Sequence, residues 1–250
     1  MRAVMSETER KSGAAFQPLY APDKATKTQC NGSGRWQPGE LIPNEFQLAA
    51  EFNVSQGTVR KALMALEADK LIVRHQGRGT YVARHTPQRA LFQFFRMVDE
   101  GGKRLTPTSQ PLSQTQRKAT REQARLLGVE PGTMLHVITR VRLFGADPAI
   151  FERILVPVAL MPELAVTLGT EMTDEMYVIY QDRFLITIAR ASERLRAVRA
   201  TREEARHLAV EEGYPLLEVV RIAKDVNGKP VELRISRYKT KEYSYATEVT

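Results

Sequence analysis

The chain has 250 residues, and its 37 Lys and Arg side chains against 29 Asp and Glu give a formal net charge of +8. The single cysteine, Cys30, excludes an internal disulfide and a cysteine-based zinc cage, and four histidines leave little material for a metal site. Because no apolar run approaches the roughly 18 to 20 residues of a membrane-spanning helix, and residues 1–15 lack the apolar stretch of a signal peptide, we expect a cytoplasmic protein with no membrane contact, no metal and no cofactor.

Residues 41–83 follow the pattern helix, turn, helix, β-wing. Asn44 precedes a run with apolar residues at helical spacing, and Gln47 stands three residues later, which is the sequence pattern of a capping box. After a tight turn, Ser55 is the predicted N-cap of a second helix with a polar start. In helix-turn-helix proteins that start meets base edges in the major groove, so this segment predicts a DNA-binding domain.

The side chains at the start of the second helix have the chemistry that DNA binding requires. Gln56 can pair with adenine, and Arg60 can pair with guanine or bind phosphate. The glycine-rich hairpin tip at residues 75–79 fits a wing that contacts phosphates or the minor groove. An ordinary polar helix with a solvated turn is the alternative, which the two motifs together disfavour. The predicted DNA-binding residues are Asn44, Gln47, Ser55, Gln56, Gly57, Thr58, Arg60, Lys61, Gln76, Gly77 and Arg78.

Residues 85–108 join the two halves of the chain. Pro87, the Gly101-Gly102 pair and Pro107 suit a linker. The segment Leu91-Phe-Gln-Phe-Phe95 interrupts it, and three phenylalanines this close together would be costly in solvent. We expect them to cover an apolar surface of the second domain.

The second half of the chain contains an internal repeat. Residues 119–129 match residues 200–210 at eight of eleven positions. In each copy a threonine, Thr120 or Thr201, is the predicted N-cap of a short helix, and two strands joined by a hairpin turn follow. The two copies therefore predict a pseudo-twofold α+β domain. The predicted strands and the one further predicted helix cover residues 135–144, 216–224 and 185–198, and residues 173–181 with Thr173 as the N-cap.

The first motifs resemble the winged-helix domain of GntR-type bacterial transcription regulators, in the branch named after the histidine-utilisation repressor (HutC). Residues 91–250, with the repeated unit, resemble the UTRA effector-binding domain of that branch, which has a chorismate-lyase-like fold. The resemblance covers about residues 16–250. The matching blocks are Pro18-Leu-Tyr20, Trp36-Gln-Pro-Gly-Glu-Leu-Ile-Pro-Asn-Glu45, Val54-Ser-Gln-Gly-Thr-Val-Arg-Lys-Ala-Leu63 and Gln76-Gly-Arg-Gly-Thr-Tyr-Val82.

The resemblance implies a fold, a function and partners. The α+β chain is expected to combine an N-terminal winged helix-turn-helix with a C-terminal α+β effector-binding domain. It implies a sequence-specific transcription regulator, a repressor rather than an activator, that binds a pseudo-palindromic operator in double-stranded DNA as a homodimer. A small-molecule effector in the second domain would control operator affinity. The expected divisions are a disordered tail at 1–15, the DNA-binding domain at 16–84, a linker at 85–108 and the effector-binding and dimerisation domain at 109–250.

Two other functions are open: a lyase-like enzyme and a DNA-binding protein that responds to no effector. The sequence has no Ser-His-Asp arrangement, phosphate loop or dinucleotide fingerprint. We therefore expect no enzymatic activity. The length of the second domain argues against a protein that only binds DNA.

Three departures from the family pattern affect the DNA-binding domain. Relatives often carry arginine at the positions of Phe46 and Gln56, so the operator sequence is open. Residues 21–35, where a first helix is expected, lack apolar residues at helical spacing. Our hypothesis is that two compensating frameshifts span this segment, and resequencing the DNA tests it.

The strands of the second domain carry the candidate effector site. Arg140 and Arg142 lie two residues apart and share one strand face. In relatives an arginine, a glutamate and a tyrosine at such positions contact the ligand, which implies an anionic or hydroxyl-rich effector; salt bridges on a solvated sheet face are the alternative. The acidic pair Asp174-Glu175 would repel phosphate, so an organic acid or a sugar derivative is favoured. The predicted effector-binding residues are Arg140, Arg142, Glu152, Thr173, Glu232, Arg234 and Tyr238.

Overall fold

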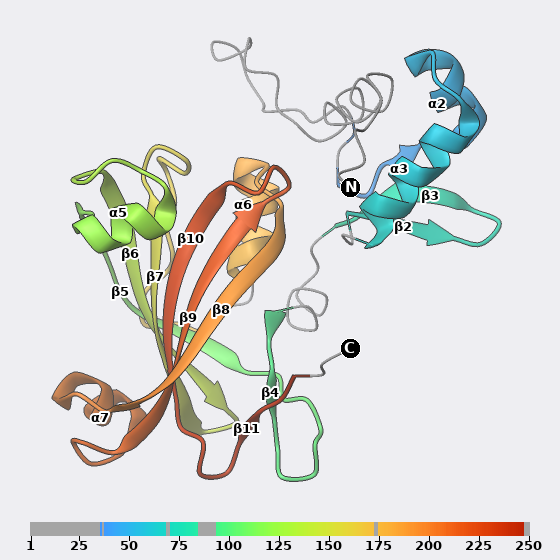
Figure 1. Ribbon diagram of the computed structural model, residues 1–250. Coiled ribbons are helices and arrows are strands. Elements are labelled where there is room, and N and C mark those ends of the chain that lie inside the picture. The colour runs from blue at the N-terminus through green and yellow to red at the C-terminus, as the bar shows by residue number, and fades with distance from the viewer. Residues whose placement is uncertain (1–35, 37, 69–70, 85–93, 173–174, 248–250) are drawn as a thin grey trace, which may run out of the picture. The chain divides into compact units, whose positions relative to one another are not determined.

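The computed structural model describes residues 36, 38–68, 71–84, 94–172 and 175–247 (Figure 1). The chain divides into two compact units, Met1–His85 and Thr86–Thr250. The predicted first helix at 21–35, with its frameshift hypothesis, and the predicted effector residue Thr173 lie outside the described residues. Among the described helices, none has the length and apolar character needed to cross a membrane.

The first unit contains the predicted helix, turn, helix and hairpin. Asn44 and Gln47 form the predicted capping box at the start of the first described helix, and Ser55 Oγ accepts a hydrogen bond from Thr58 N (3.1 Å) at the start of the second. The buried side chains include Leu48, Val59 and Leu63, as the helical spacing predicts. The elements are β1 (Leu41–Ile42), α2 (Glu45–Phe52), α3 (Gln56–Ala68), β2 (Ile72–His75) and β3 (Gly79–Val82), with sheet order β1-β3-β2.

The hairpin between β2 and β3 depends on glycine. Gly79 has φ +109°, and a Cβ added there would lie 2.7 Å from Leu41 Cδ1 of β1. The backbone conformation therefore favours glycine, whereas the exposed Leu41 side chain could move aside for a Cβ. Arg78 N donates to His75 O (3.0 Å) and closes the turn at the tip.

The second unit is built on one six-stranded antiparallel sheet. Its order is β5-β6-β7-β10-β9-β8, so the strands of the two repeated segments meet where β7 pairs with β10. The helix of each segment contacts a strand of the other segment: α5 contacts β10 and α7 contacts β7. The elements are β5 (Thr108–Lys118), α5 (Arg121–Leu127), β6 (Met134–Phe144), β7 (Asp147–Pro157), α6 (Met176–Phe184), β8 (Ile188–Arg199), α7 (Arg202–Leu208), β9 (Pro215–Asp225) and β10 (Pro230–Tyr238).

The two short helices α5 and α7 begin as predicted. Thr120 and Thr201 each form a complete capping box, with Gln123 and Glu204 as the returning side chains. In Figure 1, α5 and α7 lie toward opposite ends of the sheet. The prediction of a helix starting after Thr173 was wrong, because α6 starts at Met176 with Glu175 as its N-cap residue.

The apolar core on one face of the sheet explains the position of α6. Met176, Tyr177 and Tyr180 of α6 pack with Ile138, Ile154 and other buried residues of the strands. Phe94 belongs to the same cluster, and Phe95 belongs to a second cluster with Met97 and Tyr238. The prediction that the phenylalanine-rich segment covers the second domain is confirmed for these two residues.

Part of the segment predicted as a linker is packed within the second unit. Strand β4 (Met97–Val98) pairs with β11 (Ser244–Tyr245), and Met97 is fully buried. The polypeptide that enters the second unit is thus held from Phe94 onward. This brings Phe94 and Phe95 next to the polar residues of the sheet.

Candidate DNA-binding surface and effector pocket

The start of α3 presents the predicted DNA-binding side chains to solvent. Gln56, Gly57, Arg60 and Lys61 are exposed, and Thr58 is half-buried because its hydroxyl and that of Ser55 lie 2.9 Å apart. The backbone of this turn is thereby fixed by local contacts. The exposed side chains are free of the core and suit contact with a flat, polar partner.

Asn44 and Gln47 hold each other's backbone at the start of α2. Asn44 Oδ1 accepts from Gln47 N (2.9 Å), and Gln47 Oε1 accepts from Asn44 N (3.0 Å). Each side chain therefore uses its oxygen for the helix cap and keeps its amide NH2 group, a donor suited to phosphate. The wing residues Gln76, Gly77 and Arg78 are exposed.

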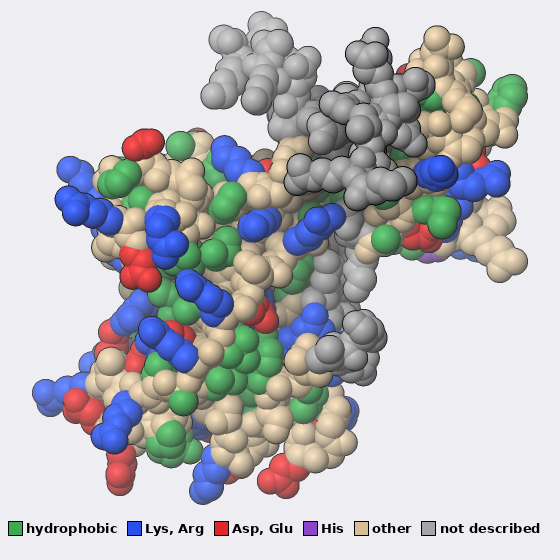
Figure 2. All heavy atoms as spheres, in the orientation of Figure 1, with side chains coloured by type: hydrophobic (Ala, Val, Ile, Leu, Met, Phe, Trp, Pro, Cys, Tyr) green, Lys and Arg blue, Asp and Glu red, His purple; other side chains and the backbone are tan. Residues whose placement is uncertain are grey.

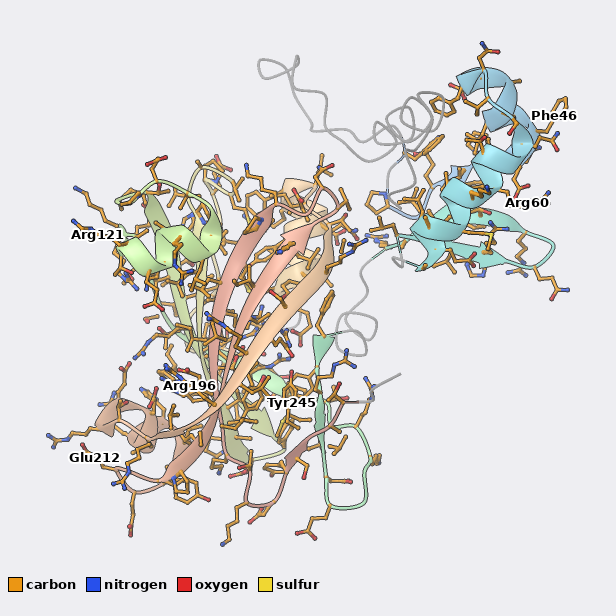
Figure 3. The ribbon with its side chains drawn as sticks, in the orientation of Figure 1. Phe46, Arg60, Arg121, Arg196, Glu212 and Tyr245 are labelled. Carbon is orange, nitrogen blue, oxygen red and sulfur yellow. The ribbon has the colours of Figure 1, made fainter. Side chains whose placement is uncertain are left out.

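A carboxylate at the start of α2 joins three elements of the first unit. Glu45 Oε2 lies 3.0 Å from Arg60 Nε of α3, and Glu45 Oε1 lies 3.8 Å from Arg74 Nη1 of β2. The next residue, Phe46, is 69% exposed, which is unusual for so large an apolar side chain. In Figure 3, Phe46 extends away from α2, and Arg60 lies on α3.

Charge alone does not mark a binding surface on the second unit. On the face shown in Figure 2, Lys and Arg side chains are spread over the sheet and its helices, with acidic side chains among them. The candidate effector site comes instead from charges that are buried. They lie on the sheet face covered by α6.

Arg140 and Glu152 form the centre of this buried polar cluster. They are cross-strand partners on β6 and β7, with Arg140 Nε 2.7 Å from Glu152 Oε2. Ser236 Oγ donates to Glu152 Oε1 (2.9 Å), and Arg234 Nη1 lies 3.8 Å from Glu152 Oε2. Burial alone would raise the pKa of Glu152, but the guanidinium groups of Arg140 and Arg234 outweigh it and hold that pKa below its ordinary value.

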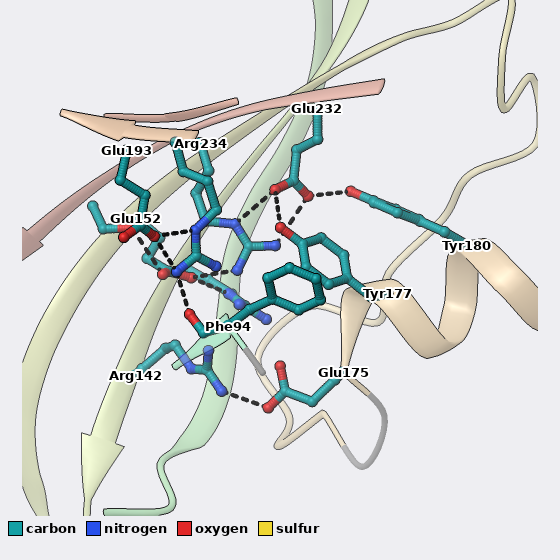
Figure 4. A network of polar contacts seen from close by, with 12 residues as sticks. Phe94, Arg142, Glu152, Glu175, Tyr177, Tyr180, Glu193, Glu232 and Arg234 are labelled. Atoms are coloured by element: carbon teal, nitrogen blue, oxygen red, sulfur yellow. Dashed lines mark hydrogen bonds and ion pairs between the residues drawn. The ribbon is translucent and has the colours of Figure 1, made fainter. Parts of the chain in front are cut away.

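Glu232 of β10 is the second carboxylate of the cluster (Figure 4). It accepts two hydrogen bonds of 2.9 Å from Arg234, one from Tyr180 (2.7 Å) and one from Tyr177 (3.2 Å). Burial and the nearby Glu232 raise the pKa of Tyr177 to about 12, so its hydroxyl stays protonated and donates. Glu232 is fully buried, and all of these contacts are internal to the second unit.

Arg142 is one of three arginines that line a small pocket beside the cluster. Its Nη2 binds the carboxylate of Glu175, and its guanidinium lies 5.0 Å from the centre of the Phe95 ring. Burial, followed by the charge of Arg140, lowers the pKa of Arg142 to about 10, so it remains charged at neutral pH. The pocket has a volume of about 20 Å³, roughly enough for one water molecule. Its lining residues are Phe94, Phe95, Arg142, Glu175, Met176, Tyr177, Arg221 and Arg234.

Three guanidinium nitrogens in this region lack a hydrogen-bond partner within the described part of the chain: Arg140 Nη1, Arg140 Nη2 and Arg142 Nε. Buried guanidinium groups are normally satisfied, so these unpaired N–H groups are unusual. Of the two residues, Arg142 lines the pocket, whereas Arg140 is fully buried beside it in the same polar cluster. The structure thus combines a small pocket with unused positive donors. A ligand that brings acceptor oxygens, as an acid or a hydroxyl-rich molecule does, matches this arrangement.

The structure brings together most of the predicted effector residues, but not all of them at the pocket. Arg142 and Arg234 line it, whereas Arg140, Glu152 and Glu232 are buried in the same network. Tyr238 is buried with Phe95 and Met97 in an apolar cluster and does not line the pocket. The alternative was right that a cross-strand salt bridge forms, between Arg140 and Glu152, but wrong that the sheet face is solvated, because both residues are buried.

Several residues of the pocket were not predicted. Arg221 is 5% exposed, donates through Nε to Glu193 Oε1 (2.6 Å) and binds the carbonyl oxygen of Phe94. The signal was present, because the repeat aligns Arg221 with Arg140. Tyr177 and Glu175 come from α6, whose position over the sheet no local pattern indicates.

Comparison with known proteins adds independent information. Residues 32–82 match the model of the bacterial regulatory proteins of the gntR family, and residues 102–244 match the UTRA domain. The HTH-type transcriptional repressor NagR of Bacillus subtilis is 32% identical over 88% of this chain and 89% of its own. The histidine utilization repressor of Pseudomonas putida is 31% identical over 84% and 83%.

A solved structure matches the second unit. The ligand-binding domain of a GntR-family transcriptional regulator from Bordetella bronchiseptica has 28% sequence identity and a TM-score of 0.60. The match covers 67% of this chain and 100% of that one.

Proposed function

Because the chain belongs to the GntR family of bacterial transcription regulators with a UTRA domain, in the group that includes the histidine utilization repressors, we propose that it acts as a homodimer on a pseudo-palindromic operator. The homodimer loses operator affinity when a small acid or sugar derivative binds beside Arg142. That it is an effector-regulated DNA-binding repressor of transcription, and not an enzyme, follows from the named functions of its relatives.

In this proposal the residues at the start of α3 read the operator. Gln56 and Arg60 are exposed and carry the side chains suited to adenine and guanine, while Ser55, Thr58 and the wing residue Arg78 contact phosphates. The remaining predicted DNA-binding residues assist them. This set comprises Asn44, Gln47, Gly57, Lys61, Gln76 and Gly77. DNA lies in the cytoplasm of a bacterium, which is where we propose that the protein acts.

The observation that carries the effector proposal is the pocket lined by Arg142, whose Nε is unpaired among the described residues, with the unpaired Nη1 and Nη2 of buried Arg140 in the same polar cluster. A carboxylate or a set of hydroxyl groups would accept from these donors. Glu175 already places one carboxylate on Arg142, which disfavours a phosphate dianion there. An organic acid, or a sugar derivative that carries no phosphate at this position, therefore suits these donors best, and the pocket, which has room for about one water molecule, must widen to admit it.

Effector binding would change the operator affinity by shifting a population. A ligand that binds one form of the dimer better than the other favours that form in proportion to its differential affinity. We propose that the favoured form no longer matches the spacing of the operator half-sites.

The proposed domain organisation follows the same reasoning. We propose a DNA-binding domain at 16–84, a connection at 85–108 and an effector-binding and dimerisation domain at 109–250. The two helix-strand-strand segments would be related by a pseudo-twofold axis between β7 and β10, in a chorismate-lyase-like arrangement. The symmetric strand order and the exchanged helix contacts support this relation.

The proposal is tested with the purified full-length chain. Duplexes are first selected from a randomised library by binding to the protein, and affinity for a selected duplex is compared with that for random DNA. Specific binding, with one dimer per inverted-repeat site by sedimentation, is the expected result. Equal affinity for both DNAs would overturn the sequence-specific proposal. A panel of carboxylic acids, sugar acids and sugar phosphates is then screened for release of the selected duplex.

A further inference from the structure

The carboxylate of Glu45 forms ion pairs with one arginine on α3 and one arginine on β2. Its carboxylate is 3.0 Å from Arg60 Nε on α3 and 3.8 Å from Arg74 Nη1 on β2, the strand that leads into the wing. Glu45 is the first residue of α2, directly after the N-cap Asn44. Its backbone position is therefore fixed by the helix start, and its side chain reaches two other elements from there.

The geometry of the Arg60 contact matters for DNA recognition. Glu45 binds Arg60 through Nε, and the two terminal nitrogens take no part in this hydrogen bond. Those terminal nitrogens are the pair that binds guanine O6 and N7, or two phosphate oxygens. With Arg60 63% exposed, the free side chain would otherwise sample many rotamers.

The charge of Glu45 opposes non-specific binding. A carboxylate beside two arginines lowers the positive potential that they present to phosphates, and it competes with phosphate for both guanidinium groups. A residue placed only for DNA affinity would not be acidic. The position of Glu45 is instead suited to orienting Arg60, and its negative charge weakens the sequence-independent attraction of the first unit to DNA.

We propose that Glu45 is a positioning residue for operator recognition: it holds Arg60 by Nε, so that the terminal nitrogens face a base, and it restrains Arg60 from binding phosphates indiscriminately. Glu45 thus raises the ratio of operator to random-DNA affinity. This inference rests on the DNA-binding function and adds a determinant of specificity that itself contacts no base.

The matched control is Glu67 of α3. Glu67 Oε2 lies 3.0 Å from Arg74 Nε, so it is an acidic partner of the same wing arginine, and the partner of Arg60 is Glu45. Removing either carboxylate changes the net charge equally. A difference between the two variants therefore reports the position of the carboxylate.

The experiment measures the affinity of full-length Glu45→Ala, Glu45→Gln and Glu67→Ala for a duplex selected by the wild-type chain and for random DNA, across salt concentrations. For Glu45→Ala we expect the affinity ratio to fall about tenfold and the salt dependence for random DNA to steepen by about one phosphate contact. Glu67→Ala should change the ratio by less than about twofold. Glu45→Gln keeps an acceptor for Arg60 Nε and should fall between wild type and Glu45→Ala.

A double variant separates positioning from stability. In an Arg60→Ala background, Glu45→Ala should change the affinity ratio by less than about twofold, because its target is gone. Thermal unfolding of each variant reports any loss of the α2 start. Equal ratios for Glu45→Ala and Glu67→Ala, or an undiminished Glu45→Ala effect without Arg60, would overturn the proposal. If the wild-type chain selected no duplex at all, the DNA-binding function itself would fail.

Discussion

Arg140 of β6 and Glu152 of β7 face each other across neighbouring strands, with 2.7 Å between Nε and Oε2, and their side chains are 0% and 2% exposed. Both charges have left water, and each depends on the other and on a few hydrogen bonds. The two terminal nitrogens of Arg140 have no hydrogen-bond partner among the described residues. The pair is therefore sensitive to any loss of charge on Glu152.

The first prediction concerns Glu152→Gln. Removing this carboxylate leaves Arg140 buried without its counter-charge and should lower the free energy of unfolding of the second unit by about 3 to 5 kcal/mol at neutral pH. Urea unfolding followed by circular dichroism measures the loss. The exposed Glu122→Gln is the control and should remain within about 0.5 kcal/mol of wild type.

The same variant gives a pH dependence with a defined sign. The pKa of Glu152 in the folded protein lies below its ordinary value of 4.5, so its contribution to stability is complete above pH 4.5 and is lost as the pH falls below it. The difference in unfolding free energy between wild type and Glu152→Gln should shrink by about 1.4 kcal/mol per pH unit in that range. A difference that stayed constant between pH 5 and pH 3 would contradict this.

Glu175 should determine the response of the pocket to phosphate. It binds Arg142, its side chain is 16% exposed, and it places a negative charge where an anion would bind. Glu175→Gln should strengthen the binding of inorganic phosphate by about tenfold or more, measured as the phosphate dependence of the unfolding temperature. Glu171→Gln, an exposed carboxylate nearby in sequence, should leave it unchanged. The same phosphate response in both variants would exclude this role of Glu175.

Arg60 and Arg78 should differ in what they contribute to DNA binding. Arg60→Ala should weaken binding to a selected duplex by about 1 to 3 kcal/mol and relax the preference for one base pair. Arg78→Ala should cost less, act alike on selected and random DNA, and flatten the salt dependence. Fluorescence anisotropy at two or more salt concentrations measures both. If Arg78→Ala changed base preference, the wing would read bases and the assignment would be reversed.

The two capping boxes of the second unit provide a test of the repeat. Thr120→Ala and Thr201→Ala each remove the oxygen that accepts from the third residue of α5 or α7, and each should cost about 1 kcal/mol. Thr→Ser at either position keeps the oxygen and should restore most of the stability. Thermal unfolding of the four variants checks this, and a cost near zero would show that the caps are dispensable.

The sequence predicted the elements whose causes are local. Asn44, Thr120 and Thr201 cap helices through contacts three residues away, and such pairs can be read directly from the chain. The alternation of Arg140 and Arg142 also placed both residues on the same face of a strand. Local causes thus account for these helix starts and for which residues share a strand face, and not for the order of the strands in the sheet.

The sequence did not predict features whose causes are distant contacts. The predicted N-cap of α6 was wrong by two residues. Glu175, the observed N-cap residue, forms no cap hydrogen bond, and its carboxylate binds Arg142, 33 residues away, so no local pattern marks this start. The sequence also did not predict that the polar face of the sheet is buried, because its burial depends on α6 and Phe94 covering the sheet. Tyr238 shares its strand face with Glu232 yet lies in an apolar cluster, because that face extends past the pocket.

Phe94 and Phe95 line the candidate effector pocket and are also the first described residues of the second unit. Arg221 binds the carbonyl oxygen of Phe94, so the backbone there is anchored by the pocket itself. A ligand bound beside Arg142, as we propose, would therefore meet the first described residues of the second unit. The strength of the contact between Arg221 and Phe94 then becomes a free-energy term that the ligand can change.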